Sequence, residues 1–301
     1  NYPRLSCHTR TGNTLTFITK YKPHCYCIPP AGFFLFYFYD RILPDKIMKG
    51  TLNMNISNMN NIESRVQSYW TKRAHNFNIV RKNELNSSIS ERWREEIVHF
   101  LPEGKVLQIL DIGTGTGYFA ILLSQIGHQV TGIDLTDAML KEARDNAALY
   151  QVHPTFQQMD AQKLAFLDQS FDVVISRNLT WTLPDPESAY REWMRVLKKG
   201  GILLNFDADY ASNVRNQNTS ASHISDTEVY GHCGVTPELE QENASITLSM
   251  PMSRKQRPYW DQEFLENIGF SRSGYDLSVG QNILKEHDLK DAPMFLVWGV
   301  R

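Results

Sequence analysis

Apolar residues recur with helical or strand-like spacing along most of the chain after position 61. At 62–80 they recur every three or four residues, which predicts a helix, and Ser90 is expected to cap a second helix that stops before Pro102. Beyond it, short continuous apolar runs predict buried strands, and the segments between them have helical spacing. The predicted strands are 106–110, 129–134, 155–159, 171–176, 200–206, 271–278 and 294–300, and the predicted helices among them are 118–126, 137–150 (capped by Thr136), 187–197 and 259–270.

Strands that alternate with helices of about ten residues predict an α/β fold with a doubly wound, mostly parallel sheet. Two stretches depart from the rhythm. Residues 50–61 are polar and rich in Asn, which predicts a flexible lead-in, and 208–258 is too long for an ordinary connection, so we expect a substrate-side insertion there. The expected organisation is a leader at 1–47, a helical cap at 48–104, and a main domain at 105–301 that carries the insertion.

The first 47 residues differ in composition from the rest. They hold three of the four cysteines (Cys7, Cys25 and Cys27), and no methionine precedes Met48. We interpret the segment as the tail of a larger precursor or as translated sequence upstream of a native start at Met48 or Met54, and favour the second, with a leader that is non-native or disordered. A secretory signal fits poorly, because the apolar run is not near the start and lacks a small-residue cleavage site.

The cysteines indicate neither a metal nor a disulfide framework. The C-x-C at 25–27 lacks the paired C-x-x-C spacing that closes a tetrahedral site, so no metal is expected. Cys233 is the one cysteine after the leader, which favours a reducing compartment, the cytoplasm.

Charge and hydropathy narrow the possible partners. The six Lys/Arg and two acidic residues of the first 47 positions give that segment +4, which leaves about −6 for the remainder of a chain at −2. A negative surface does not favour the phosphate backbone of nucleic acid, and small or uncharged acceptors are expected instead. The longest apolar run, 28–39, is shorter than the roughly 18–20 residues of a membrane span, so none is predicted.

The stretch "LQILDIGTGTGYFA" at 107–120 places a glycine-rich turn between a strand and a helix. Such a turn lets the backbone approach a ligand and presents the first N–H groups of the helix. Gly113, Gly115 and Gly117 depart from the G-x-G-x-x-G spacing of dinucleotide sites, which argues against a nicotinamide-dependent oxidoreductase. Asp111 before the turn would repel a pyrophosphate, and would either attract a cationic group or orient the loop. The pattern therefore predicts a nucleoside that lacks phosphates and carries a cationic tail.

S-adenosylmethionine meets that description, and "LDIGTGTG" resembles the first motif of the class I S-adenosylmethionine-dependent methyltransferases. The resemblance runs over about 66–206 and is closest to the small-molecule branch that includes the ubiquinone and menaquinone biosynthesis methyltransferases. It implies a Rossmann-like seven-stranded sheet, a cofactor loop that includes Thr114, and in-line methyl transfer to a small-molecule acceptor. A regulatory protein or subunit that binds S-adenosylmethionine or S-adenosylhomocysteine without methyl transfer is the alternative.

A second cofactor element is Asp134, seventeen residues after Gly117 at the end of the second strand. A carboxylate there can accept hydrogen bonds from both ribose hydroxyls, although a strand-terminal Asp can also simply begin a turn. The resemblance implies that Asp160 reaches the adenine amino group and that the Ala161 backbone reaches the ring; a plain Asx turn is the alternative for Asp160. The expected cofactor site also includes Leu135 and Met139.

Two further residue pairs are expected in the cofactor site, and the first of them beside the reacting methyl. Arg177 and Asn178 lie at the carboxyl end of the fourth strand, where ligands collect in such sheets. Tyr69 and Arg73 are one helical turn apart on the preceding helix. The resemblance implies that this helix covers the cofactor, with Tyr69 near the sulfonium and Arg73 near the methionine carboxylate; a packing stripe with a solvated Arg73 is the alternative. Lys199 replaces a proline common in the family, which affects turn stiffness more than chemistry.

The acceptor is not specified by the sequence. The segment "SRNLTW" at 176–181 does not match the N/D-P-P-Y/F box of base amino-methyltransferases, and a glutamate pair suited to arginine methylation is missing from this loop. Whether O, N, S or C is methylated, and the oligomeric state, stay open. Trp181 and Tyr210 follow strand ends on the ligand side and are expected to line the acceptor pocket. Candidate catalytic groups, for each of which a solvated or capping role is the alternative, are Asp207, His223 and His232.

Overall fold

The computed structural model describes residues 45–217 and 233–301, and the side chains of 61–216 and 233–301. The candidates His223 and His232, and the leader up to residue 44, lie outside the described residues. The chain divides into two units, Asn1–Ile47 and Met48–Arg301, and the second contains the sheet and the candidate site.

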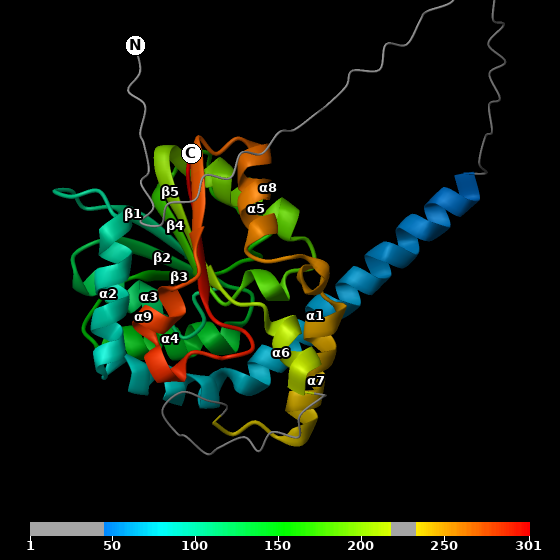
Figure 1. Cartoon of the computed structure of the whole chain (residues 1–301), viewed down its shortest axis with the longest axis horizontal. Coiled ribbons are helices and arrows are strands. Elements are labelled where there is room, and N and C mark those ends of the chain that lie inside the picture. Colours follow the sequence, from blue (N-terminus) through cyan, green and yellow to red (C-terminus); the bar gives the residue numbers. More distant parts are fainter. Residues whose placement is uncertain (1–44, 218–232) are drawn as a thin grey trace, which may run out of the picture. The chain divides into compact units, whose positions relative to one another are not determined.

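A seven-stranded sheet in the order β3-β2-β1-β4-β5-β7-β6 forms the centre of this second unit (Figure 1). Its first five strands are parallel, and β7 pairs antiparallel with both β5 and β6. This confirms the predicted doubly wound, mostly parallel sheet. The strands are β1 (Gln108–Ile112), β2 (Gln129–Asp134), β3 (Thr155–Gln158), β4 (Phe171–Arg177), β5 (Leu197–Asp207), β6 (Arg272–Asp276) and β7 (Phe295–Val300).

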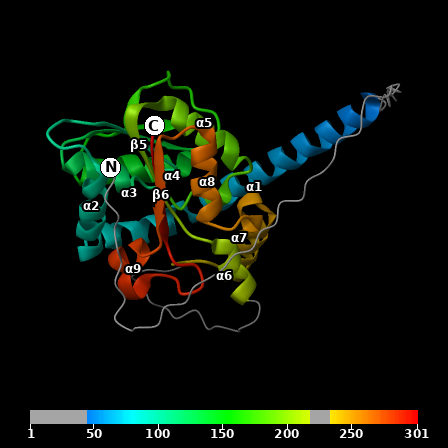
Figure 2. The ribbon, with the colours of Figure 1, turned by 45° about the horizontal axis from the view of Figure 1, so that its top comes forward.

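Helices cover both faces of the sheet, as Figure 2 shows. On one face α2, α3 and α9 pack around the fully buried Trp93, and on the other α5 and α8 pack around Tyr190 and Trp193. The helices are α1 (Asp45–Leu85), α2 (Ser88–Phe100), α3 (Tyr118–Gln125), α4 (Asp137–Leu149), α5 (Pro186–Val196), α6 (Tyr210–Gln217), α7 (Pro237–Ser249), α8 (Tyr259–Ile268) and α9 (Val279–Ile283), with 3-10 turns η1 (Thr180–Thr182), η2 (Pro251–Arg254) and η3 (Lys285–His287).

Two expectations about the N-terminal helices are wrong. Residues 50–61, expected as a flexible lead-in, belong to α1, because after Gly50 this stretch contains no Gly or Pro that would stop a helix. The cap of α2 is Ser87, whose hydroxyl oxygen accepts a hydrogen bond from the Ile89 N–H, whereas Ser90 lies in the first turn and donates to the Ser87 carbonyl.

The segment after β5 contains regular structure rather than a plain loop. It forms α6, α7 and η2, and α6 lies beside α7 in Figures 1 and 2. Ile246 and Met250 from this segment pack with Val66 and Tyr69 of α1. Arg65 of α1 and Glu242 of α7 add an ion pair at 2.9 Å between Nε and Oε1. The described part of the insertion is therefore attached to α1.

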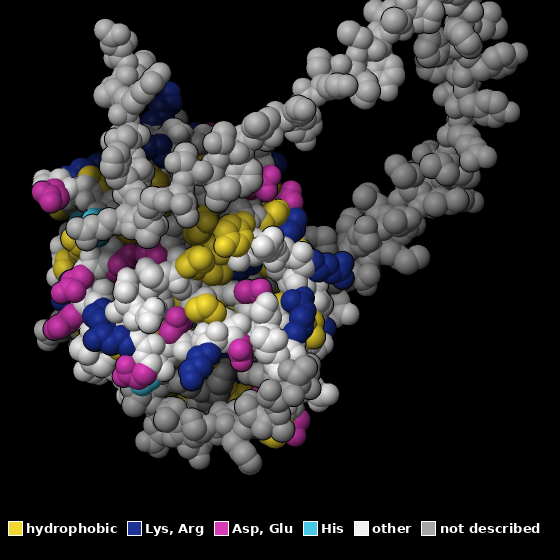
Figure 3. Space-filling view, viewed as in Figure 1, with side chains coloured by type: hydrophobic (Ala, Val, Ile, Leu, Met, Phe, Trp, Pro, Cys, Tyr) yellow, Lys and Arg dark blue, Asp and Glu magenta, His cyan; other side chains and the backbone are white. Residues whose placement is uncertain are grey.

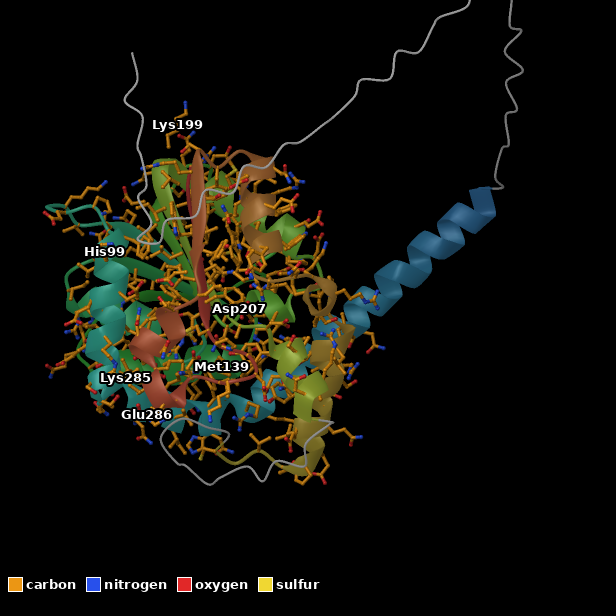
Figure 4. All side chains as sticks on the ribbon, in the orientation of Figure 1. His99, Met139, Lys199, Asp207, Lys285 and Glu286 are labelled. Atoms are coloured by element: carbon orange, nitrogen blue, oxygen red, sulfur yellow. The ribbon has the colours of Figure 1, made fainter. Side chains whose placement is uncertain are left out.

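The carboxyl ends of the parallel strands lie at one edge of the sheet, which brings Asp134, Arg177 and Asp207 to the same end of the molecule. Figure 4 shows Lys199 at the opposite end of β5 from Asp207. The turn in which Lys199 replaces proline is thus remote from the candidate site.

Candidate functional site

Asp111 holds the glycine loop together from beneath. Its side chain is buried, and Oδ2 accepts hydrogen bonds from the Thr114 hydroxyl at 2.6 Å and from the Ala120 N–H in α3 at 3.1 Å. The sequence left two roles for Asp111, attracting a cationic group or orienting the loop, and these contacts show that it orients the loop. Burial raises the pKa of Asp111 to about 7, and the two hydrogen bonds oppose that shift only in part.

The loop glycines have a backbone conformation that other residues rarely adopt. Gly113, Gly115 and Gly117 have φ values of 67°, 54° and 85°. At Gly113 a Cβ atom would lie 2.9 Å from the Leu179 side chain, so the loop and the segment after β4 approach too closely for a larger residue. Gly117 is the N-cap of α3. The glycines therefore permit both the sharp turn and the close packing around it.

Asp134 connects the second strand to this loop. Its Oδ2 accepts from the Gly115 N–H at 3.0 Å, and its Oδ1 accepts from the Thr136 N–H at 2.8 Å. The carboxylate is half-buried, and burial raises its pKa to about 6. Since an acid with that pKa is mostly ionised at pH 7, the group retains acceptor capacity for a ligand hydroxyl.

The residue after Asp134 receives two amide side chains that the sequence did not single out. Gln67 of α1 and Gln158 of β3 donate through Nε2 to the Leu135 carbonyl, at 3.1 and 2.9 Å. Gln67 lies two positions before Tyr69 in α1, the helix that was expected to cover the cofactor, so its place on that helix was a signal that could have identified it. Met139, also expected in the site, is buried in α4 and is labelled in Figure 4.

Asp160 forms the Asx turn that was its alternative interpretation. Its Oδ1 accepts from the Gln162 N–H at 2.9 Å. Ala161 is buried, and its carbonyl accepts from Trp193 Nε1 at 2.9 Å. These contacts fix the backbone of the segment, while the expected contacts with adenine stay a prediction.

The helix α1 lies against the glycine loop. The Phe77 ring is 3.6 Å from the position that a Cβ would take at Gly115. Tyr69 is buried in the packing stripe, where burial raises its pKa. Arg73 is 3% exposed rather than solvated, and its Nη1 donates to the Cys233 carbonyl at 2.7 Å. Arg73 thus ties the insertion to α1, and its contact with a methionine carboxylate stays a prediction.

Arg177, expected beside the reacting methyl, is paired with a glutamate of α1. Its Nη1 donates to Glu84 Oε1 at 2.8 Å, and its guanidinium lies 4.4 Å from the Trp93 ring centroid. Burial disfavours ionisation of the Glu84 carboxyl. The positive charges of Arg177 and Arg81 outweigh this effect and hold the pKa of Glu84 below its usual value. The spacing of three between Arg81 and Glu84 was visible in the sequence, but the contact with Arg177 was not, because Arg177 is 93 positions away.

Asn178 follows directly with a φ of 57°, which turns the chain away from β4. Its N–H donates to the Phe206 carbonyl at 2.8 Å, and its own carbonyl accepts from Trp181 Nε1 at 2.9 Å. Asn178 therefore positions the aromatic side chain that was expected to line the acceptor pocket.

Asp207, a candidate catalytic group, is instead part of a buried polar network. Its Oδ2 accepts from Arg257 Nη1 at 2.9 Å and from the Trp181 N–H at 3.1 Å, and it also accepts from the Thr180 hydroxyl. Burial raises the pKa of Asp207, and Arg257 counteracts that shift. With these partners Asp207 fits a structural role; its catalytic assignment stays untested.

Arg257 extends the network to α8 and α5. Its Nε and Nη2 donate to the two Asp261 oxygens at 3.0 and 2.9 Å, and Tyr190 donates its hydroxyl to Asp261 Oδ1 at 2.7 Å. The three side chains are at most 8% exposed. Sequence reasoning missed Arg257, because it precedes Pro258 and lies before the first residue of α8, so helical spacing did not indicate its contact with Asp261.

Trp181 and Tyr210 meet as expected for two residues that follow strand ends. Their ring centroids are 4.9 Å apart. With Met252, Thr247 and their neighbours they line a cavity of about 10 Å³, roughly the size that holds one water molecule. Within the described ranges no group of three or more His, Cys, Asp or Glu side chains is arranged to hold a metal ion.

The sheet order, with the glycine loop after β1 and the acidic residue after β2, is the Rossmann-like fold of the class I methyltransferases. Residues 110–205 match the family described as "Methyltransferase domain". The match spans β1 to β5 and includes the loop, Asp134 and the segment after β4.

Several known proteins are similar to the chain. The malonyl-[acyl-carrier protein] O-methyltransferase of Erwinia pyrifoliae is 28% identical over 171 residues, which cover 57% of this chain and 63% of that protein. The ubiquinone/menaquinone biosynthesis C-methyltransferase UbiE of Desulfotalea psychrophila is 38% identical over 119 residues, which cover 39% and 48%. In both cases the aligned region spans less than two thirds of the relative.

Among solved structures, the phosphoethanolamine N-methyltransferase 2 of Haemonchus contortus in complex with S-adenosyl-L-methionine has a TM-score of 0.51 and 18% identity. The match covers 69% of this chain and 52% of that protein. It supports the fold assignment.

Proposed function

We propose that the chain transfers a methyl group from S-adenosylmethionine to a small-molecule acceptor. The observation that carries the proposal is the hydrogen bond between the Asp134 carboxylate and the Gly115 N–H. This hydrogen bond joins the glycine loop and the carboxylate after β2, the two elements that suit a nucleoside with a cationic tail. The match of residues 110–205 to the methyltransferase family model supports the same activity.

The residues present fit this cofactor. The positive φ values of Gly113 and Gly115 shape the turn, no side chain extends from Gly115 into the space beside Phe77, and Asp134 offers an ionised acceptor to ribose hydroxyls. S-adenosylmethionine supplies a methyl group already activated by its positive sulfur. The protein is left to hold the acceptor in line and to exclude water, for which the α1 side chains Tyr69 and Phe77 are suitably placed.

For the acceptor, we propose a small molecule bound against Trp181 and Tyr210. The ring pair and Met252 give an apolar, aromatic wall, and the cavity of about 10 Å³ beside it has to widen before it admits an acceptor larger than water. By their names, one relative is an O-methyltransferase of malonyl-[acyl-carrier protein] and another is a C-methyltransferase of ubiquinone and menaquinone biosynthesis, so relatives of this chain differ in their acceptors. The net negative charge after residue 47 disfavours nucleic acid. No described helix is long and apolar enough to cross a membrane. The presence of a single cysteine after residue 47, Cys233, supports a reducing compartment, the cytoplasm.

Cofactor binding can be tested with Asp134→Ala. Removing the carboxylate should weaken binding of S-adenosylhomocysteine by about 1–3 kcal/mol, because charge-assisted hydrogen bonds to the ribose are lost. Isothermal calorimetry measures the change. Asp137→Ala is the matched control, because Asp137 is an exposed aspartate three positions further on, in the first turn of α4.

Tight binding of NAD with no binding of S-adenosylhomocysteine would contradict the proposed cofactor. Activity is tested separately, by incubating the full chain with methyl-labelled S-adenosylmethionine and metabolite extracts. A labelled product supports methyl transfer, and binding without product in broad extracts would contradict it.

A further inference from the structure

The strand β6 ends the sheet, and no described strand pairs with its outer side. Every second residue of an edge strand points backbone N–H and C=O groups away from the sheet, which makes the edge a template for another strand. The opposite edge strand, β3, carries uncharged polar residues at Thr155, Gln157 and Gln158. The edge at β6 has a different character.

Apolar side chains are exposed beside this edge. Tyr259 of α8, Tyr275 of β6 and Leu277 are 45%, 38% and 51% exposed, and the two tyrosine rings lie 5.2 Å apart, edge to face. Figure 3 shows hydrophobic side chains gathered where β6 lies beside α8. The two tyrosines form a contiguous exposed aromatic pair, and exposed apolar groups of this kind commonly mark an interaction site.

The sequence of β6 is complementary to itself in the antiparallel direction. In a two-fold pairing centred on Gly274, Arg272 of one copy stands opposite Asp276 of the other, and the same contact repeats across the axis. On the other face of the strand, the small Ser273 stands opposite the large Tyr275. One register therefore matches both charge and size.

The charges at the two ends of the strand are suited to this contact. Arg272 is exposed, and it forms no ion pair with a described residue. Asp276 is half-buried and lies close to Glu96 of α2: burial, and then the Asp276 carboxylate, raise the pKa of Glu96. An arginine from a second copy would meet two neighbouring acidic groups.

We propose that two copies of this chain pair through their β6 strands, antiparallel about Gly274, with the Tyr259, Tyr275 and Leu277 side chains covered between them. The pairing continues the seven-stranded sheet of each copy into the other. It does not depend on the proposed methyltransferase activity, and the candidate cofactor site lies at other strands.

Charge-swap variants of the full chain test the pairing by sedimentation equilibrium. Arg272→Asp and Asp276→Arg should each raise the dimer dissociation constant by at least about tenfold, because each replaces two symmetry-related attractive pairs by repulsive ones. The double variant restores the opposite charges and should return the constant to within about threefold of the original. Thermal melting confirms that each variant is folded.

The double exchange Arg144→Asp with Asp145→Arg on α4 is the matched control, because these exposed residues lie on the helix that packs against β2 and β3. It should leave dimerisation unchanged. Asp276 also accepts a hydrogen bond from the Ser278 N–H, so Arg272→Asp, which keeps that contact, tests the pairing even if Asp276→Arg does not fold.

A chain that is monomeric up to high micromolar concentration overturns the proposal. So does a dimer whose dissociation constant is unchanged in folded Arg272→Asp.

Discussion

Two buried aspartates at strand ends are stabilised in different ways. Asp111, in β1, receives neutral donors from residues three and nine positions further along the chain. Asp207, in β5, accepts a hydrogen bond from the guanidinium of Arg257, fifty positions away. It also accepts hydrogen bonds from Thr180 and Trp181, which lie in another loop. The first is a local arrangement around a turn, and the second joins three separate segments.

The difference shows why the same residue type suits two tasks. Without a cationic partner, burial raises the pKa of Asp111 to about 7, so its charge is marginal at neutral pH and its role is to hold the loop. Asp207 is held in an ion-pair network that includes a second carboxylate, Asp261. That network fixes the wall formed by Trp181, and it depends on a single arginine.

The largest effect is expected from Arg257→Met. It leaves Asp207 and Asp261 buried without their cation, and removing one partner of a buried ion pair costs about 3–5 kcal/mol of the free energy of unfolding. Urea denaturation monitored by circular dichroism measures the loss. Arg254→Met, at an exposed position three residues earlier, should change stability by less than about 0.5 kcal/mol. Equal effects of the two variants would show that the network contributes nothing beyond surface packing.

A smaller, pH-dependent effect is expected from Asp111→Asn. Because the folded-state pKa of Asp111 is raised from 3.8 to about 7, its stabilising contribution is full below about pH 4 and is lost as the pH rises through 7. Asparagine stays neutral throughout. Between about pH 5 and pH 8 the free energy of unfolding of the native chain should therefore fall by about 2–4 kcal/mol relative to that of the variant. Unfolding free energies of both proteins at each pH measure this difference. A constant difference between the two proteins would mean that Asp111 does not titrate in this range.

The smallest effect is expected at an ion pair that resembles the buried network in chemistry but not in burial. The Arg65 and Glu242 side chains are 34% and 38% exposed, so solvent screens their attraction. The coupling energy from Arg65→Met, Glu242→Gln and the double variant should be below about 1 kcal/mol. A coupling well above that value would indicate that burial is not what separates this pair from the Arg257 network.

The sheet could be predicted because its strands are short, continuously apolar runs. Each of the seven predicted strands overlaps an observed one, with shifts such as 106–110 against Gln108–Ile112 in β1. Helix ends were less predictable. The start of α1 and the cap of α2 depend on which of several similar polar residues closes the first turn, and Ser87 and Ser90 offer the same hydroxyl.

For the candidate site, the sequence by itself determined the glycine turn and the carboxylates around it. The positive φ values at Gly113, Gly115 and Gly117, and the hydrogen bonds that Asp111 accepts from Thr114 and Ala120, arise within a dozen residues. Their physical cause is local: backbone conformation and hydrogen bonds between near neighbours in the chain.

Tertiary structure alone decided which distant groups would meet. It paired Glu84 with Arg177, attached Arg73 to the Cys233 carbonyl, and enclosed Asp207 with Arg257. These partners are 50 to 160 positions apart, and each is matched because burial makes an unpaired charge or donor costly. The sequence supplies the polar and charged groups, but only the fold determines which of them are buried together. Groups that are buried together must form hydrogen bonds or ion pairs with one another, because they have lost their contacts with water.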